Sequence, residues 1–174
     1  CEAGCRKDFR GTFRSGKLKM QMTIELKING EKHSVSLKSN RTLLDVLRED
    51  LGRKGAKKGC GEGKCGSCTV LMDGRPVNSC LVLAPEAAGA EITTIEGLSP
   101  GKPHPLQSAF SEKGAVQCGF CTPGMILTSK ALLDLEPGAH GTRIREAISG
   151  NLCRCTGYIK IVEAVESCAS QADK

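Results

Sequence analysis

Eight of the eleven cysteines in this chain fall into two groups of four, and this grouping restricts the possible folds more than any other feature. The first group has the spacing C-x4-C-x2-C, followed by a fourth cysteine after eleven residues, and the second consists of two close pairs. In order, the groups are Cys60, Cys65, Cys68 and Cys80, and then Cys118, Cys121, Cys153 and Cys155. One residue separates Cys153 from Cys155, and a disulfide across that spacing would be strained.

The cysteines are predicted to bind metal rather than to form disulfides, because the sequence has no secretory feature. Residues 1–22 contain basic residues but no apolar segment of a signal peptide. The longest apolar run, Cys80–Ala84, is too short to span a bilayer. We therefore expect a cytoplasmic protein without a membrane span, in which reduced cysteines serve as ligands. A secreted disulfide scaffold would leave one of the eleven thiols spare.

The formal net charge of +6 is unevenly distributed and argues against nucleic-acid binding. A net charge of +4 lies in residues 1–22, so the rest of the chain is close to neutral. Only five residues are aromatic, which leaves few surfaces on which bases could stack. We interpret residues 1–22 as a basic tail that is disordered or not native, since Met20 and Met22 are both possible starts.

The first half of the chain alternates apolar and polar residues as strands do. In TIELKI, residues 23–28, every second residue is apolar, and EKHSVSL continues the pattern after an Asn-Gly pair that favours a tight turn. TVLMDGRPVN, residues 69–78, predicts a second hairpin with Asp-Gly at its turn. EITTI, residues 91–95, predicts a further strand.

One helix is predicted between the two hairpins. RTLLDVLREDLG, residues 41–52, has leucines at helical spacing. Thr42 or Asn40 could cap its start, and Gly52 could end it. Together these elements predict a mixed α+β unit over residues 23–99.

The second half of the chain is predicted to be helical. GLSPGKPHP, residues 97–105, has three prolines and two glycines and predicts a linker, with a domain boundary near Pro100. Pro123 after Thr122 fits a capped helix start, and Thr142 fits another. The helical domain is predicted over residues 100–170, with helices at 105–114, 122–136, 142–152 and 158–169.

The first cysteine group has the spacing of a plant-type [2Fe–2S] site. Glycines at 59, 61, 63 and 66 would let the loop adopt positive φ and approach the sulfurs. Their N–H groups could then donate to sulfur and influence the reduction potential. A zinc ribbon is the alternative, but the glycine density and the cysteine triplet favour iron and sulfur.

The second group, Cys118, Cys121, Cys153 and Cys155, is less specific. Both cysteine pairs precede predicted helices, whose positive ends would favour thiolates. A four-thiolate zinc site, a [4Fe–4S] cluster and a second [2Fe–2S] cluster all remain open from spacing alone. No histidine lies in either motif, which disfavours a Rieske-type centre.

The strings GAVQCGFCTPGMIL and GNLCRCTGYIKIVEAV closely resemble the C-terminal half of the iron–sulfur subunit of the molybdenum hydroxylases. That family includes xanthine dehydrogenases, aldehyde oxidoreductases, molybdenum-type carbon monoxide dehydrogenases and 4-hydroxybenzoyl-CoA reductases. GCGEGKCGSCTV with Cys80 resembles the N-terminal half. The resemblance extends from about Thr23 to about Val165.

This resemblance implies an α+β protein with a ferredoxin-like β-grasp domain, followed by a four-helix bundle with pseudo-twofold symmetry. Each domain would hold one [2Fe–2S] cluster, the first on Cys60, Cys65, Cys68 and Cys80, and the second on Cys118, Cys121, Cys153 and Cys155. The second cluster would lie beside a molybdenum–pterin cofactor of a partner subunit, which Gln117 and Cys155 would face. Electrons would pass through both clusters to FAD or another acceptor.

The implied partners are a large molybdenum-binding subunit and a medium FAD-binding subunit, in a heterotrimer that could dimerise. This chain would belong to an oxidoreductase, but we find no Ser/His/Asp arrangement, phosphate-binding loop or paired carboxylates that would transform a substrate. The alternatives are a stand-alone two-cluster redox carrier and a zinc-stabilised interaction module.

Several residues near the motifs have no assigned chemistry. The basic run at 53–58 is either a solvated face or a docking site for an acidic acceptor. Arg154 could donate to a sulfur, to the pterin side or to a partner, and Tyr158 is expected to pack at a helix start. Cys168 is interpreted as a small apolar residue of the last helix, and the spacing of Cys1 and Cys5 suggests no site.

Overall fold

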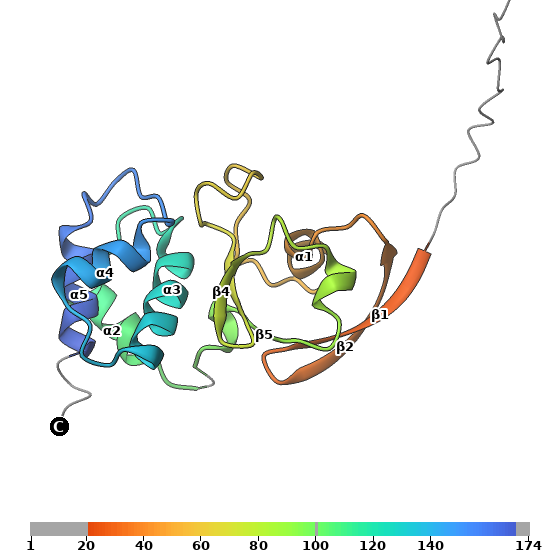
Figure 1. Ribbon diagram of the computed structural model, residues 1–174, viewed down its shortest axis with the longest axis horizontal. Coiled ribbons are helices and arrows are strands. Elements are labelled where there is room, and N and C mark those ends of the chain that lie inside the picture. The colour runs from red at the N-terminus through yellow and green to blue at the C-terminus, as the bar shows by residue number, and fades with distance from the viewer. Residues whose placement is uncertain (1–20, 100, 170–174) are drawn as a thin grey trace, which may run out of the picture.

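The computed structural model describes residues 21–99 and 101–169. Residues 1–20 of the predicted basic tail, including Cys1 and Cys5, lie outside this part. The chain forms a sheet half, residues 21–99, and a helical half, residues 101–169, which lie side by side (Figure 1). The protein is therefore α+β, as predicted.

The sheet half contains a mixed five-stranded sheet of order β2-β1-β5-β3-β4. The two predicted hairpins and the later strand are confirmed, and β1 starts two residues earlier than the alternation indicates. Strand β5 pairs parallel to β1 and antiparallel to β3, so it joins the hairpins into one sheet. The strands are β1 Gln21–Ile28, β2 Glu31–Lys38, β3 Thr69–Met72, β4 Arg75–Asn78 and β5 Glu91–Thr93.

The single predicted helix over 41–52 is only partly α-helical. One α turn, α1 (Leu43–Asp45), continues as a π-helix, η1 (Val46–Asp50). Thr42 caps α1 by accepting from the Asp45 N–H at 3.1 Å, and Leu51 N–H bonds the Val46 carbonyl five residues back at 3.1 Å. The π-helical turn is wider than an α turn, and in this segment four apolar side chains are completely buried: Leu43, Leu44, Val46 and Leu47. Burying a side chain of this size stabilises a fold by about 1.5–3 kcal/mol. Short 3-10 helices, η2 (Ala84–Ala87) and η3 (Ile95–Gly97), flank β5.

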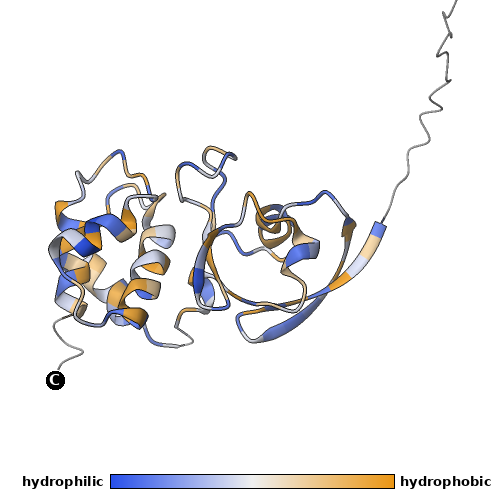
Figure 2. Cartoon of the chain, viewed as in Figure 1, coloured by the Kyte–Doolittle hydropathy of each residue, from blue (hydrophilic) through white to orange (hydrophobic). Residues whose placement is uncertain are grey.

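The helical half contains the four helices predicted after residue 100, with shorter bounds. They are α2 Pro105–Glu112, α3 Thr122–Leu135, α4 Gly141–Ile148 and α5 Ile159–Ala169. These helices carry both apolar and polar residues, as amphipathic helices around a shared core do (Figure 2). The side chains fully buried among them include Leu106, Phe110, Met125, Ile144 and Ile148.

Two predicted helix caps are wrong. Helix α3 begins at Thr122, so Cys121 rather than Thr122 occupies the N-cap position. Helix α4 has His140 at the N-cap, and Thr142 lies inside the helix. A carboxylate oxygen of Glu166 in α5 accepts from the Gly141 N–H at 2.7 Å, and this tertiary contact starts α4 earlier than the sequence indicates.

The two halves meet along α3, which packs against β3. Leu127 and Ala131 of α3 form a small buried cluster with Leu71 of β3. Gly124 permits the close approach, because a Cβ there would lie 2.4 Å from the Gly66 carbonyl oxygen. The contact places the start of α3 beside the loop that precedes β3. Within the described ranges, every helix is too short or too polar to cross a membrane.

Candidate metal centres

The first centre is formed by the four cysteines of the sheet half. Cys60 and Cys65 lie on the loop between η1 and β3, Cys68 immediately precedes β3, and Cys80 follows β4. Their thiols are paired, Cys60 with Cys65 and Cys68 with Cys80. Cys60 is exposed and Cys65 half-buried, whereas Cys68 and Cys80 are buried. The hairpin β3–β4 therefore supplies the inner pair, and the loop supplies the outer pair.

Backbone N–H groups of the loop point at the outer pair. Glu62 and Lys64 each donate to Cys60 Sγ at 3.3 Å, and Cys60 donates to Cys65 Sγ at 3.4 Å. The hydrogen bonds from Glu62 and Lys64 are the main cause that lowers the pKa of Cys60 to about 7. The N–H groups that donate to sulfur therefore belong to Cys60, Glu62 and Lys64, whereas the prediction assigned this role to the N–H groups of the glycines. The glycines instead shape the loop: Gly61, Gly63 and Gly66 have positive φ.

Gly59 does not adopt positive φ, but the loop still requires a glycine at this position. A Cβ on Gly59 would lie 2.8 Å from Cys65 Sγ. The missing side chain therefore leaves room for a ligand sulfur, as the prediction for this loop required.

The second centre is formed by the loops α2–α3 and α4–α5. Cys118 and Cys121 lie on the first loop, and Cys153 and Cys155 lie on the second. Cys118 Sγ is 3.6 Å from Cys155 Sγ, and the thiols of Cys121 and Cys153 form the other pair. The outer pair, Cys118 and Cys155, is exposed, Cys121 is buried and Cys153 is half-buried. The two loops therefore bring the four thiols together.

Burial raises the pKa of two inner thiols, Cys68 and Cys121. It raises the pKa of Cys68 to about 11 and, with the neighbouring Cys153 thiol, that of Cys121 to about 12. At Cys121, burial therefore outweighs the helix N-terminus that was expected to favour the thiolate. Metal binding at these positions would have to displace the proton.

Cys153 differs from the other inner thiols because Thr156 donates to it. The Thr156 hydroxyl lies 3.1 Å from Cys153 Sγ. Burial by itself would raise the pKa of Cys153, but hydrogen bonds from the Thr156 hydroxyl and backbone outweigh it, and the pKa is lowered. Tyr158 contributes from the other side, because its hydroxyl accepts from the Cys153 N–H at 2.8 Å. The sequence prediction assigned no role to Thr156 and only packing to Tyr158.

Both centres have the donor set that a [2Fe–2S] cluster needs. Such a cluster takes four cysteine thiolates, two on each iron, and each centre presents its four thiols as two pairs. A single zinc ion would instead need its ligands around one point. Among residues 21–99 and 101–169, no three His, Cys, Asp or Glu side chains are arranged in that way. Two pairs of thiols match the two irons of such a cluster.

A buried hydrogen-bond network joins the two centres. We define the junction as Cys65, Gly66, Asn151 and Leu152. The Leu152 N–H donates to the Cys65 carbonyl at 2.9 Å, and the Asn151 side chain donates to the Gly66 carbonyl at 3.0 Å. Asn151 also donates to Thr69 Oγ1 at 3.2 Å and accepts from Thr128 Oγ1 at 2.9 Å. The sequence contains no signal for the contacts of Asn151 with Gly66 and Thr69, because they join residues more than 80 positions apart.

The surface around the second centre is exposed and largely apolar. Gln117 and Arg154 are exposed beside the outer cysteines, and Arg154 makes no hydrogen bond or ion pair within the described part of the chain. The apolar side chains that flank the centre and remain exposed are Val116, Phe120, Leu152 and Ile159.

The basic run before the first centre is mostly engaged within the chain. Arg53 pairs with Glu31 at 3.5 Å, and Lys58 approaches Asp45 at 3.8 Å. Lys57 donates to the Gly55 carbonyl at 3.0 Å and lies 5.9 Å from the centre of the Phe120 ring. These contacts favour a structural role over a free docking face. Cys168 is half-buried against the helical core, as expected of a small apolar residue.

Two family models match the chain in tandem. Residues 26–94 match a 2Fe-2S iron-sulfur cluster binding domain, and residues 94–166 match a [2Fe-2S] binding domain. Each match contains one of the two four-cysteine groups.

Relatives with established names match over most of the chain. The nicotinate dehydrogenase small FeS subunit of Eubacterium barkeri is 54% identical over 86% of this chain and 99% of its own length. The 6-hydroxypseudooxynicotine dehydrogenase complex subunit beta of Paenarthrobacter nicotinovorans is 51% identical over 83% of this chain and 90% of its own length. Among solved structures, a chain of quinoline 2-oxidoreductase from Pseudomonas putida 86 is 46% identical and superposes with a TM-score of 0.84, over 88% of this chain and 96% of that one.

Proposed function

Because this chain belongs to the family of iron–sulfur subunits of the molybdenum hydroxylases, we propose that it relays electrons from a molybdenum–pterin site on a partner subunit, through two [2Fe–2S] clusters, to FAD or another acceptor. The observation that carries this proposal is the hydrogen bond from Leu152 to Cys65. It connects a predicted ligand of one centre to the residue that precedes Cys153, a predicted ligand of the other.

The eight cysteines are the ligands in this proposal. Cys60, Cys65, Cys68 and Cys80 hold one cluster, and Cys118, Cys121, Cys153 and Cys155 hold the other. A bound [2Fe–2S] cluster supplies one-electron chemistry. The chain fixes the ligand sulfurs on four segments, donates hydrogen bonds to some of them and buries Cys68, Cys80 and Cys121. The paired thiols and the loop N–H groups support this assignment.

The second centre faces the molybdenum subunit in this proposal, with Gln117 and Cys155 toward its pterin. Both residues are exposed, as a contact with a partner requires. The exposed apolar residues Val116, Phe120, Leu152 and Ile159 support the same orientation, because clustered apolar surface marks interaction sites.

The remaining parts of the proposal concern domains and assembly. The sheet half would be a β-grasp domain, and the helical half a four-helix bundle with pseudo-twofold symmetry, divided near Pro100. The chain would assemble with a large molybdenum subunit and a medium FAD subunit in a heterotrimer, which could dimerise. The names of the relatives, which are subunits of dehydrogenases and an oxidoreductase, support a multi-subunit complex.

Electron paramagnetic resonance of the as-purified complex, reduced without oxygen and recorded at several temperatures, tests the function. We expect two distinct signals of about one spin each per copy of this chain. One signal would leave the second centre as zinc or empty. A colourless protein without a signal would contradict the proposal and favour the zinc module, and purification without a partner would favour the stand-alone carrier.

A further inference from the structure

Thr156 is hydrogen-bonded on both sides within the loop that carries Cys153 and Cys155. Its hydroxyl donates to Cys153 Sγ at 3.1 Å and accepts from the Tyr158 N–H at 3.3 Å. A hydroxyl has one hydrogen to donate. Here that hydrogen is directed at the sulfur, while the hydroxyl oxygen accepts from the Tyr158 N–H.

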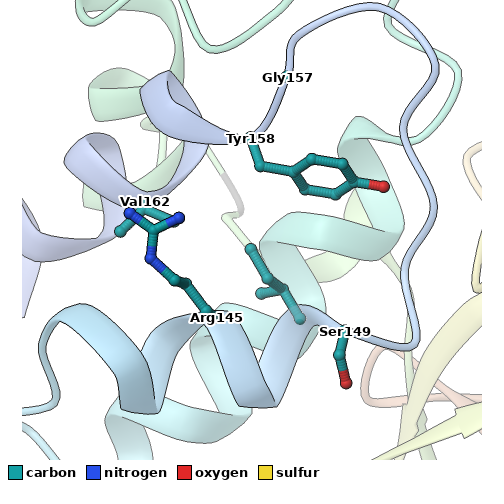
Figure 3. A pocket seen from close by; sticks show the side chains of 6 residues that line it. Arg145, Ser149, Gly157, Tyr158 and Val162 are labelled. Carbon is teal, nitrogen blue, oxygen red and sulfur yellow. The ribbon is translucent and has the colours of Figure 1, made fainter.

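Tyr158 is itself held by three hydrogen bonds, one through its N–H to Thr156 and two through its hydroxyl and its carbonyl. Its hydroxyl accepts from the Cys153 N–H at 2.8 Å, and its carbonyl accepts from the Val162 N–H at 3.0 Å in the first turn of α5. Its ring borders a cavity of about 250 Å³, with its hydroxyl pointing away from the Arg145 guanidinium (Figure 3). These contacts hold Tyr158 at φ +69°, a conformation that non-glycine residues rarely adopt. The Thr156 hydroxyl that donates to Cys153 is therefore oriented by a residue whose own position is held by hydrogen bonds.

Within the described part of the chain, no side-chain hydroxyl donates to a sulfur of the first centre. The hydrogen bonds to its outer sulfurs come from the backbone N–H groups of Cys60, Glu62 and Lys64. Within residues 21–99 and 101–169, Thr156 is the only residue whose side-chain hydroxyl donates to one of the eight candidate ligand sulfurs. A substitution at this position therefore changes one centre and leaves the other as an internal reference.

We propose, resting on the function inferred above, that Thr156 is a positioning residue that raises the reduction potential of the second cluster through the sulfur of Cys153. Reduction adds one electron and increases the negative charge shared by the ligand sulfurs. A hydrogen-bond donor at 3.1 Å stabilises that charge. The effect is electrostatic and moves no proton. It therefore changes the equilibrium between the oxidised and reduced forms of the second cluster, and not the chemistry of a substrate.

The test is a redox titration of the complete complex, in which electron paramagnetic resonance monitors each cluster. The wild type, Thr156→Val and Thr156→Ser are compared. Valine has nearly the shape of threonine but no hydroxyl, whereas serine keeps the hydroxyl. We expect Thr156→Val to lower the equilibrium constant for reduction of the second cluster about tenfold. For a one-electron couple, this corresponds to a reduction potential that is lower by about 59 mV. Thr156→Ser should remain near the wild type, and the first cluster should keep its potential in every variant.

Two signals in the wild type with no shift in Thr156→Val would overturn the inference and leave the proposed function intact. A shift of both clusters together would also overturn it, because it would indicate a general change in structure. If Thr156→Val loses the second signal, Thr156→Ala is titrated instead, since alanine adds no bulk near the sulfur. Loss of the signal in both, with retention in Thr156→Ser, would assign the hydroxyl to cluster assembly and reject a tuning role.

Discussion

The backbone N–H of Leu152 donates to the carbonyl oxygen of Cys65 at 2.9 Å, although the two residues belong to different halves of the chain. Leu152 precedes Cys153, so this hydrogen bond joins the loops of both candidate centres. Asn151 and Gly66 complete the junction through a second, buried hydrogen bond of 3.0 Å. These two hydrogen bonds, together with the packing of α3 on β3, hold the two centres in their relative position.

Replacing Asn151 with alanine should loosen the junction. The change removes three hydrogen bonds and leaves buried groups of Gly66, Thr69 and Thr128 without this partner. We expect a loss of about 3 kcal/mol, or roughly hundredfold faster local opening, measured by amide hydrogen exchange of residues 64–69 and 150–155. Thr128→Val removes one of these bonds and should lose only about 1 kcal/mol. Equal exchange in the two variants would contradict a central role for Asn151.

Gly66→Ala should prevent the two halves from closing together. Gly66 has φ +67°, and a Cβ there would lie 2.5 Å from the Asn151 amide nitrogen and 2.6 Å from the Gly150 carbonyl oxygen. Strain and overpacking together should lower the free energy of unfolding by about 2–5 kcal/mol. Gly74→Ala is the matched control, because Gly74 has φ +78° but open space around it, and it should lose about 1–2 kcal/mol. Thermal unfolding and iron content are measured for both variants. If Gly66→Ala loses no more stability and iron than Gly74→Ala, crowding around Gly66 is unimportant.

Cys121→Ser should remove the second cluster alone. Cys121 is buried and paired with Cys153, and a serine hydroxyl is a poor substitute for a thiolate ligand. We expect one of the two magnetic resonance signals to disappear and the iron content to fall by about half. Cys168→Ser changes a half-buried cysteine outside both groups and should keep both signals. Retention of both signals in Cys121→Ser would reject the ligand assignment.

Leu152→Asp should weaken binding of the molybdenum subunit. Leu152 is 53% exposed beside the second centre, and a carboxylate there would be buried without a partner in the complex. We expect at least about tenfold weaker association, measured by titration of one subunit with the other. Leu135→Asp is the control, since Leu135 is 80% exposed at the end of α3. If the two variants bind equally well, the proposed orientation of the second centre is wrong.

The thiols of the cluster-free chain should react at different pH. Hydrogen bonds from Glu62 and Lys64 lower the pKa of Cys60 to about 7, whereas burial raises that of Cys68 to about 11. Only the thiolate reacts with iodoacetamide, so labelling of Cys60 should rise through pH 7 and that of Cys68 should remain slow up to pH 10. Mass spectrometry of the labelled peptides gives both profiles. A Cys60 profile identical to that of the denatured chain, near pH 8.5, would contradict the loop geometry.

Much of the local structure follows from short patterns along the chain. Alternation in residues 23–28 and the turn at Asn29 correctly predict the first hairpin, and the proline at 123 correctly marks the start of α3. The cap predicted at Thr142 fails because Glu166, from another helix, starts α4 earlier. The prediction of a regular helix over 41–52 fails because its second turn is a π-helix, with Val46 and Leu47 buried against the core.

Spacing and turn residues act over a few positions, so the amino-acid sequence is enough to predict which thiols are available, how they divide into two groups and which loops carry them. The family resemblance of those motifs is confirmed by the relatives. Three features become visible only in the folded chain: Thr156 donates to Cys153, burial dominates the pKa of Cys121, and Asn151 links the two halves. The link through Asn151 joins residues 85 positions apart, and the pKa of Cys121 depends on the exclusion of water by the helical core. The hydrogen bond from Thr156 depends on the conformation of its loop, which spacing along the chain does not specify.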